Sequence, residues 1–193
     1  AVLKQTGRIG ESLIISQKSL KLEPTDAEAH NNLGVLLHEV GRLAEAETSY
    51  RKATILKPDY TEAHNNLGII LKELGRLNEA ETSCRKTIIL KPKFAEAHFN
   101  LGIILKELGR LEEAVTSYGQ AIALMPDYTD AYNNLGVLLQ EVGRLEEAET
   151  SLNKAIKLEP EYAEAWNNLF FLLKVIKFQG SSTEYRLPLL DKK

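Results

Sequence analysis

One short stretch recurs along this chain at a fixed spacing, and this period constrains the fold more than any other feature. The sequence HNNLG occupies residues 30–34 and returns unchanged at 64–68, followed by HFNLG, YNNLG and WNNLF starting at His98, Tyr132 and Trp166. Each step is 34 residues (64 − 30 = 34). A fixed period of about 20–50 residues indicates an array of stacked structural repeats rather than one globular core.

Prolines and glycines recur in the same register and predict two helices in each repeat. A proline closes each repeat, which ends the preceding helix, at Pro24, Pro58, Pro92, Pro126 and Pro160. A glycine separates the first helix from the second, at Gly7, Gly41, Gly75, Gly109 and Gly143. Thr25-x-x-Glu28 and Asp59-x-x-Glu62 resemble capping boxes at helix starts. We therefore expect a partial repeat at 1–26, full repeats at 27–60, 61–94, 95–128 and 129–162, a terminal helix at 163–178, and a tail or linker at 179–193.

Apolar residues in each repeat follow helical spacing. In repeat 27–60 the first helix carries Ala29, Leu33, Leu36, Leu37 and Val40, and the second carries Leu43, Ala46, Tyr50, Ala53 and Leu56. Gly34 and Ala46 are small, as expected where two helices cross closely. One helix pair cannot bury both of its faces, so stacking on neighbouring repeats must supply the core.

These positions resemble the tetratricopeptide repeat, in which the repeat is 34 residues long. The family pattern has small residues at positions 8 and 20, an aromatic residue near position 24, alanine at position 27 and proline at position 32. In repeat 27–60 these positions hold Gly34, Ala46, Tyr50, Ala53 and Pro58. The other repeats depart from this pattern at Cys84 and Leu152, which replace the aromatic residue, and at Thr87, which replaces the alanine. The resemblance implies an all-α fold over residues 1–178, a right-handed superhelical solenoid of antiparallel helix pairs whose first helices line a concave groove.

A polar stripe runs along the first helix of each repeat. At 100° per residue, Glu28, Asn32, Val35 and Glu39 lie within about 60° of one another, opposite the apolar stripe. In the family this stripe faces the groove, where a ladder is expected from Asn32, Asn66, Asn100, Asn134 and Asn168. Asparagine is a poor helix former, but its amide can pair with the main chain of an extended peptide of any sequence. The alternative is structural: each amide ties its helix to the backbone of the next repeat.

Neighbouring residues complete the predicted peptide-binding set, which adds Asn31, Asn65 and Asn133 and the aliphatic residues Val35, Ile69, Ile103 and Val137. The aliphatic residues sit within the polar stripe, so they form either a contact strip for apolar partner side chains or a surface half-buried against the adjacent helix. Acidic residues occur nearby at Glu28, Glu62, Glu96 and Asp130. They either favour basic or neutral partners or are simply solvated. They also argue against the carboxylate clamp of the family's co-chaperones, because a terminal carboxylate would meet acids there.

Residue types that often carry chemistry here have simpler explanations. His30, His64 and His98 are one repeat apart, roughly 8–10 Å for packed helices, which is too far to share a metal ion. They are expected to replace the ring found at Tyr132 and Trp166. Cys84 takes the place of Tyr50, so we expect an inert core thiol. The sequence contains no nucleotide-binding or nucleophile motif, and we predict no catalytic residue, metal or cofactor.

Composition narrows the class of partner. A net charge of −3 argues against nucleic acid as the main partner. The sequence contains no run of about 18 apolar residues, so we expect no membrane insertion. The single cysteine fits a reducing compartment, so we expect a cytoplasmic location. The sequence thus predicts a non-enzymatic protein–protein interaction module that binds extended peptide segments in an asparagine-lined groove.

Two further hypotheses concern the whole assembly. The asparagine ladder is similar to the repeat domain of O-linked N-acetylglucosamine transferases, where such amides hold substrate chains. Bacterial chains with HNNLG-type repeats often precede glycosyltransferase or sulfotransferase domains, which implies a substrate-recruitment region of a larger enzyme. Alternatively, the chain is a self-assembling scaffold. Phe170 replaces the small glycine of the other repeats and makes the last helix unusually apolar, so we expect an end-mediated homo-oligomer.

Overall fold

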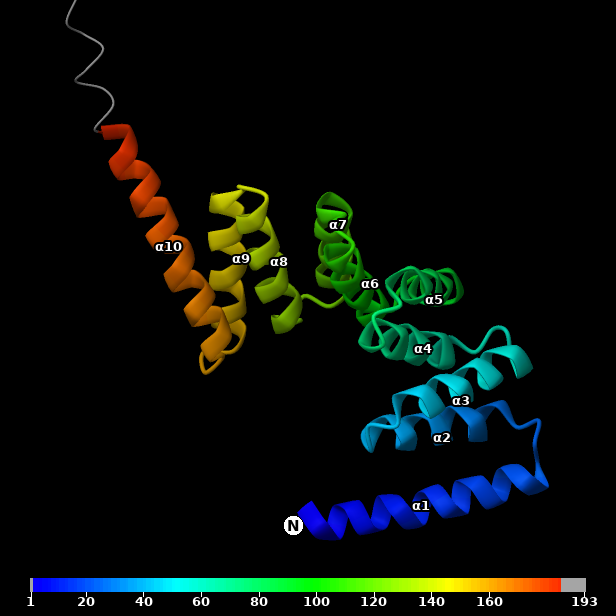
Figure 1. Cartoon of the computed structure of the whole chain (residues 1–193). Helices are drawn as coiled ribbons and strands as arrows, with labels where there is room; N and C mark the ends of the chain where they lie inside the picture. The colour runs from blue at the N-terminus through cyan, green and yellow to red at the C-terminus, as the bar shows by residue number, and fades with distance from the viewer. Residues whose placement is uncertain (1, 185–193) are drawn as a thin grey trace, which may run out of the picture. The chain divides into compact units, whose positions relative to one another are not determined.

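The computed structural model describes residues 2–184, with side chains placed for residues 9–178, and its regular structure is entirely helical (Figure 1). The chain forms two compact units, one running through Leu108 and the other starting at Gly109. The first contains α1 (Val2–Leu22), α2 (Ala27–Glu39), α3 (Leu43–Leu56), α4 (Thr61–Glu73), α5 (Leu77–Leu90) and α6 (Ala95–Glu107). The second contains α7 (Leu111–Leu124), α8 (Thr129–Glu141), α9 (Leu145–Leu158) and α10 (Ala163–Glu184). The predicted all-α architecture of consecutive helix pairs is confirmed.

The predicted mid-repeat glycines make the turn between the paired helices. Gly41 has φ +75°, in the left-handed region that costs glycine little. Its N–H donates to the His38 carbonyl (2.9 Å), and the Arg42 N–H donates to the Leu37 carbonyl (2.8 Å). This pair of bonds is a Schellman motif, which satisfies carbonyls left open at the helix end. The positive φ recurs at Gly75, Gly109 and Gly143.

The first and last helices differ from the prediction. No turn forms at Gly7, because Val2–Leu22 is a single helix. The unbroken helix carries the ladder of backbone hydrogen bonds through Gly7, so the N–H groups around it stay paired within the helix. The last helix runs past residue 178 to Glu184, so residues 179–184 of the predicted tail are helical. The rest of that tail, 185–193, lies outside the described residues.

Both predicted capping boxes are wrong. Helix α2 begins one residue later than expected, so Asp26 occupies the N-cap and its carboxylate accepts from the N–H groups of Glu28 (2.9 Å) and Ala29 (3.1 Å). Helix α4 has Tyr60 at its N-cap, with no hydrogen bond from the side chain. The proline-containing linkers therefore fix where these helices begin more than the Thr25 and Asp59 side chains do.

The core lies where the helices of each pair cross. Ala46, Tyr50 and Ala53 of α3 are buried against α2, as predicted. A Cβ atom added to Gly34 would lie 2.6 Å from Cε1 of Tyr50, so glycine is what allows this close approach. The same crossing pairs Gly68 with Cys84 and Gly136 with Leu152. Two predicted core residues at helix ends, Val40 and Leu56, are instead substantially exposed.

Charged residues cover the start of each second helix. The Arg42 guanidinium donates to both carboxylate oxygens of Glu45, at 2.7 and 2.6 Å. In the first unit Arg76 donates to both carboxylate oxygens of Glu79, and Arg51 donates to Oε2 of the same residue. These bonds lower the pKa of the Glu79 carboxyl, with Arg76 as the larger cause. These exposed pairs contribute little each, but they explain why arginine follows the turn glycine.

Candidate peptide-binding face

The paired asparagines on the first helices occupy different environments. The first of each pair is buried in the complete repeats, with exposed fractions of 6% for Asn31, 9% for Asn65 and 0% for Asn133, whereas Asn167 of α10 is exposed. The second is half-buried at Asn66, Asn100, Asn134 and Asn168 and exposed at Asn32. Successive residues on a helix point about 100° apart, so only the second asparagine lies toward the polar stripe.

Hydrogen bonds link these two asparagines across successive repeats. In the first unit, the Asn66 amide donates to Oδ1 of Asn31 (3.1 Å), and the Asn100 amide donates to Oδ1 of Asn65 (3.3 Å). In the second unit, the Asn168 amide donates to Oδ1 of Asn133 (2.9 Å). The partner is a side chain of the preceding repeat, whereas the structural alternative expected backbone of the next one.

Asn133 is the most constrained member of this set. Its own amide donates to Oε1 of Glu164 (3.1 Å) while its Oδ1 accepts from Asn168. Nearby, the Tyr162 hydroxyl donates to Oδ1 of Asp130 (3.0 Å). Burial is the main cause of a raised pKa at Tyr162, and the hydrogen bond to Asp130 raises it further. These polar groups hold the first turns of α8 and α10 in one register.

The predicted aliphatic strip is only partly accessible. Val35 is 36% exposed, while Ile69, Ile103 and Val137 are half-buried. Half-burial leaves one side of each residue free, which is compatible with both of the alternatives drawn from the sequence. The acidic residues Glu28, Glu62, Glu96 and Asp130 are exposed in their respective units.

The histidines have a structural partner that the sequence did not indicate. Nε2 of His30, His64 and His98 lies 3.0–3.1 Å from a proline carbonyl oxygen that closes the preceding repeat, in Pro24, Pro58 and Pro92. The indole N–H of Trp166 donates to the Pro160 carbonyl in the same way (2.9 Å). A carbonyl only accepts, so each Nε2 carries the proton. The signal available in the sequence was that histidine and tryptophan share a ring N–H.

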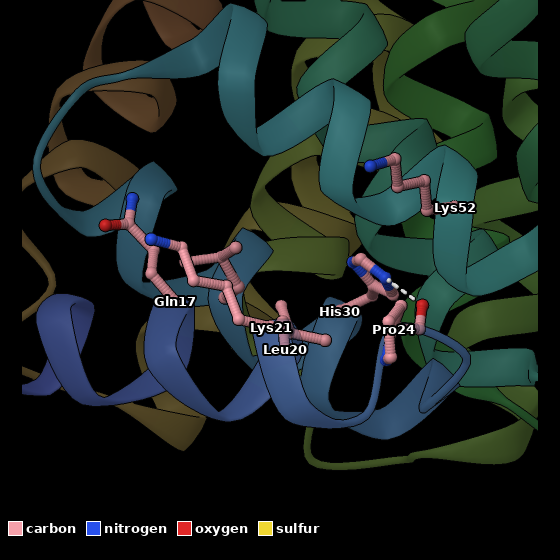
Figure 2. A pocket seen from close by; sticks show the side chains of 7 residues that line it. Gln17, Leu20, Lys21, Pro24, His30 and Lys52 are labelled. Carbon is pink, nitrogen blue, oxygen red and sulfur yellow. Dashed lines mark hydrogen bonds between the residues drawn. The ribbon is translucent and has the colours of Figure 1, made fainter.

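A pocket of about 330 Å³ adjoins His30 among α1, α2 and α3 (Figure 2). Its lining is Gln17, Leu20, Lys21, Pro24, His30, Leu33 and Lys52. His30 and Asn32 are two residues apart on α2, which places them about 200° apart around the helix axis. The pocket is therefore on the opposite side of α2 from the polar stripe. The buried Nδ1 of His30 has no hydrogen-bond partner among the described residues.

Cys84 is buried, and burial raises the pKa of its thiol to about 12. A thiol of that pKa is neither a nucleophile nor a ligand near neutral pH. Among residues 9–178, whose side chains the structure places, no group of three or more histidines, cysteines or carboxylates could hold a metal ion. The helices described here are too short or too polar to cross a bilayer.

Comparison with known proteins agrees with the observed geometry. A family model described as "TPR repeat" matches residues 36–75 and 104–143. Models described as "Tetratricopeptide repeat" match residues 129–162, 16–48, 83–116 and 62–91. The chain is a tetratricopeptide-repeat (TPR) protein. Repeats of this family act as interaction modules, and none of the models that match here describes a catalytic domain.

Solved structures of other TPR proteins share this fold. MamA is 24% identical with a TM-score of 0.77, and the match covers 83% of this chain and 94% of MamA. YrrB, described as a TPR protein with an unusual peptide-binding site, is 25% identical with a TM-score of 0.72, covering 86% of each chain. TTC0263, a thermophilic TPR protein of Thermus thermophilus, is 24% identical with a TM-score of 0.67, covering 89% of this chain and 93% of that one. The comparison with curated protein sequences gave no match.

Proposed function

We propose that this TPR protein binds an extended peptide segment along the polar stripe, gripped by the asparagine ladder. The observation that carries the proposal is the hydrogen bond from each of Asn66, Asn100 and Asn168 to a buried asparagine of the preceding repeat. That bond uses one of the two N–H donors of the amide and fixes its orientation. The second N–H then donates to a main-chain carbonyl of the peptide, and the amide oxygen accepts from a main-chain N–H.

The buried asparagines have a supporting role in this proposal. Asn31, Asn65 and Asn133 are too enclosed to reach a ligand directly, and they instead hold the ladder amides in place. Preorganised groups lose less rotamer entropy on binding, so the same hydrogen bonds give more affinity. In this proposal the buried asparagine of each bonded pair has the structural role and the ladder asparagine has the binding role, so the two interpretations of the sequence are compatible.

Spacing and charge define the kind of peptide. Packed helices lie about 8–10 Å apart, and an extended strand advances about 3.3 Å per residue, so one amide serves about three peptide residues. Val35, Ile69 and Ile103 offer apolar contact between the amides of the first unit. The exposed acids beside them favour neutral or basic peptides. YrrB, whose fold matches over most of its length, is itself described as having a peptide-binding site.

The test compares peptide binding by the intact chain and by an Asn66→Ala, Asn100→Ala variant, using an array of extended 12-residue peptides of neutral and basic sequence. Each substitution removes two peptide hydrogen bonds of about 0.5–1.5 kcal/mol each, so the two substitutions together should cost about 2–6 kcal/mol and weaken binding by roughly 30-fold or more. Asn78→Ala is the matched control, because Asn78 is an exposed asparagine at the start of α5, away from the stripe. Unchanged binding by a variant that keeps its helical circular dichroism would refute the ladder as the binding element.

A further inference from the structure

The last helix, α10, has an apolar face that its own unit leaves open. Helix α10 lies beside α9 (Figure 1). Its Leu169 and Leu172 belong to the same core cluster as Ala148 and Leu152 of α9. On a different face, Phe170 is 55% exposed and Leu173 is 45% exposed. The leucines at the place of Leu173 in the complete repeats are all buried, namely Leu37, Leu71, Leu105 and Leu139. Because α10 runs unbroken to Glu184, residues 179–184 do not turn back to supply a covering second helix.

At the other end of the described chain, α1 lacks the opposite partner: it is a second helix without the first helix of its own repeat. By register it is the second helix of a repeat, with Pro24 in the place of Pro58, but it is continuous from Val2 and no first helix precedes it among the described residues. Ile15 is 67% exposed on this helix. In the complete repeats its place is taken by a buried serine, namely Ser49, Ser83, Ser117 and Ser151. One end of the chain thus offers a first helix and the other end a second helix.

Residue sizes at the crossing point are inverted between these two helices. Inside a repeat, glycine on the first helix meets a larger residue on the second, as in Gly34 with Tyr50 and Gly136 with Leu152. The residues in the same register are Phe170 on α10 and Ser16 on α1. The large residue now lies on the first helix and the small one on the second. Phe170 could not pack against a tyrosine there, but it fits over a serine.

The asparagine pairs show a second complementarity. Asn32 is the first residue of the ladder, and Asn167 stands at the position that Asn31, Asn65 and Asn133 occupy in their repeats. Unlike those three, Asn167 is exposed, and Asn32 is exposed as well. The ladder residues Asn66, Asn100 and Asn168 each bond to an asparagine 35 positions earlier, as Asn66 does to Asn31. In a stack that continued from α10 of one copy to α1 and α2 of another, Asn167 would lie where Asn31 lies relative to Asn66. Asn32 would then find its missing acceptor.

We propose that two copies of this chain associate head to tail, with α10 of one copy and α1 of the next forming one complete repeat. A second copy supplies the matching helix in the correct register, the small residue opposite Phe170 and the acceptor for Asn32. The interface joins two different surfaces, so each copy keeps a free end and association continues into open chains unless a ring closes. This proposal does not depend on peptide binding.

Cysteine cross-linking tests the register directly. Sγ of Cys84 lies 2.7 Å from a Cβ built on Gly68, so cysteines at this pair of positions are within disulfide reach. We expect a mixture of Ser16→Cys and Phe170→Cys proteins to form a covalent dimer on oxidation. Either variant alone, or the unmodified chain with its buried Cys84, should not. The absence of a dimer in the mixture, or equally rapid dimerisation of one variant alone, would overturn the head-to-tail arrangement.

A size swap provides the second test, read by sedimentation equilibrium. The unmodified chain should exceed its monomer mass of 21.6 kDa increasingly as concentration rises. Phe170→Gly should return the mass toward that of the monomer, and adding Ser16→Tyr should restore association by recreating the Gly34–Tyr50 type of contact. Phe178→Ala, an exposed phenylalanine two turns further along α10 and about 80° away around its axis, is the control and should change nothing. A monomer at every concentration, or no recovery in the double variant, would contradict the proposal.

Discussion

The helix crossing at Gly136 in the second unit makes the sharpest prediction about stability. Gly136 of α8 and Gly119 of α7 both lie within helices, so replacing either with alanine removes the same backbone entropy cost of about 0.5–1 kcal/mol. Their surroundings differ. A Cβ at Gly119 meets nothing within 4 Å, whereas one at Gly136 lies 2.6 Å from Cγ of Leu152 and 3.2 Å from the Ala148 carbonyl oxygen.

The size of the effect follows from that overlap. Carbon atoms in contact prefer about 3.5–4.0 Å, so Leu152 must move by about 1 Å although it is fully buried. Overpacking of this kind costs about 1–3 kcal/mol. Gly119→Ala should therefore stabilise the protein by about 0.5–1 kcal/mol. Gly136→Ala should be about 1–3 kcal/mol less stable than Gly119→Ala, and between neutral and about 2.5 kcal/mol less stable than the unmodified chain.

Urea denaturation followed by Trp166 fluorescence and circular dichroism measures both variants, because Trp166 lies in the same unit. Leu152→Ala provides a check on the mechanism. If the clash is with this side chain, removing it should cost about 1–3 kcal/mol less in the Gly136→Ala background than in the unmodified chain. Equal stability of Gly119→Ala and Gly136→Ala, or strict additivity with Leu152→Ala, would refute the steric argument.

Three further outcomes are expected. Asn133→Leu leaves the Asn168 amide without its acceptor and should cost about 1–3 kcal/mol in urea denaturation, whereas Asn153→Leu on exposed α9 surface should be nearly neutral. With a pKa of about 12, the Cys84 thiol is ionised in about one molecule in ten thousand at pH 8, so iodoacetamide should label it only in urea, and equal labelling of folded protein would contradict its burial. Arg76, and then Arg51, lower the pKa of Glu79 below its ordinary 4.5 in the folded chain, so its stabilisation is present above pH 4.5 and is lost as pH falls through the folded pKa. At low salt, Glu79→Gln should therefore lose less of its urea midpoint than the unmodified chain when acidified below about pH 4.5, and an equal loss would show that the pair contributes nothing.

The sequence by itself determined the architecture. Its 34-residue period, the prolines that end second helices and the glycines at the turns act through local backbone geometry, which needs no knowledge of distant contacts. The small residues at Gly34 and Ala46 predicted the crossing point for the same reason, since helical spacing alone brings them to one face. The polar stripe of Asn32, Asn66 and Asn100 was equally readable as a face of a helix.

Sequence reasoning failed where competing local signals had to be weighed. Thr25 and Asp26 can both cap a helix, and the turn that follows Pro24 determines which of them becomes the N-cap, here Asp26. Gly7 repeats the turn signal of Gly41, yet α1 passes straight through it. Glycine is tolerated in a helix interior as well as in a turn, so the residue type by itself does not decide between the two.

Only the tertiary structure decided which partner each polar side chain takes. The amide of Asn66 finds Asn31, and the ring of His64 finds the carbonyl of Pro58. Helical periodicity gives the direction in which a side chain leaves its helix, but the atom it meets belongs to another helix or to the loop before it. The stacking of consecutive repeats decides which atoms meet. It makes buried acceptors of Asn31, Asn65 and Asn133, and each holds a half-buried amide of the next first helix.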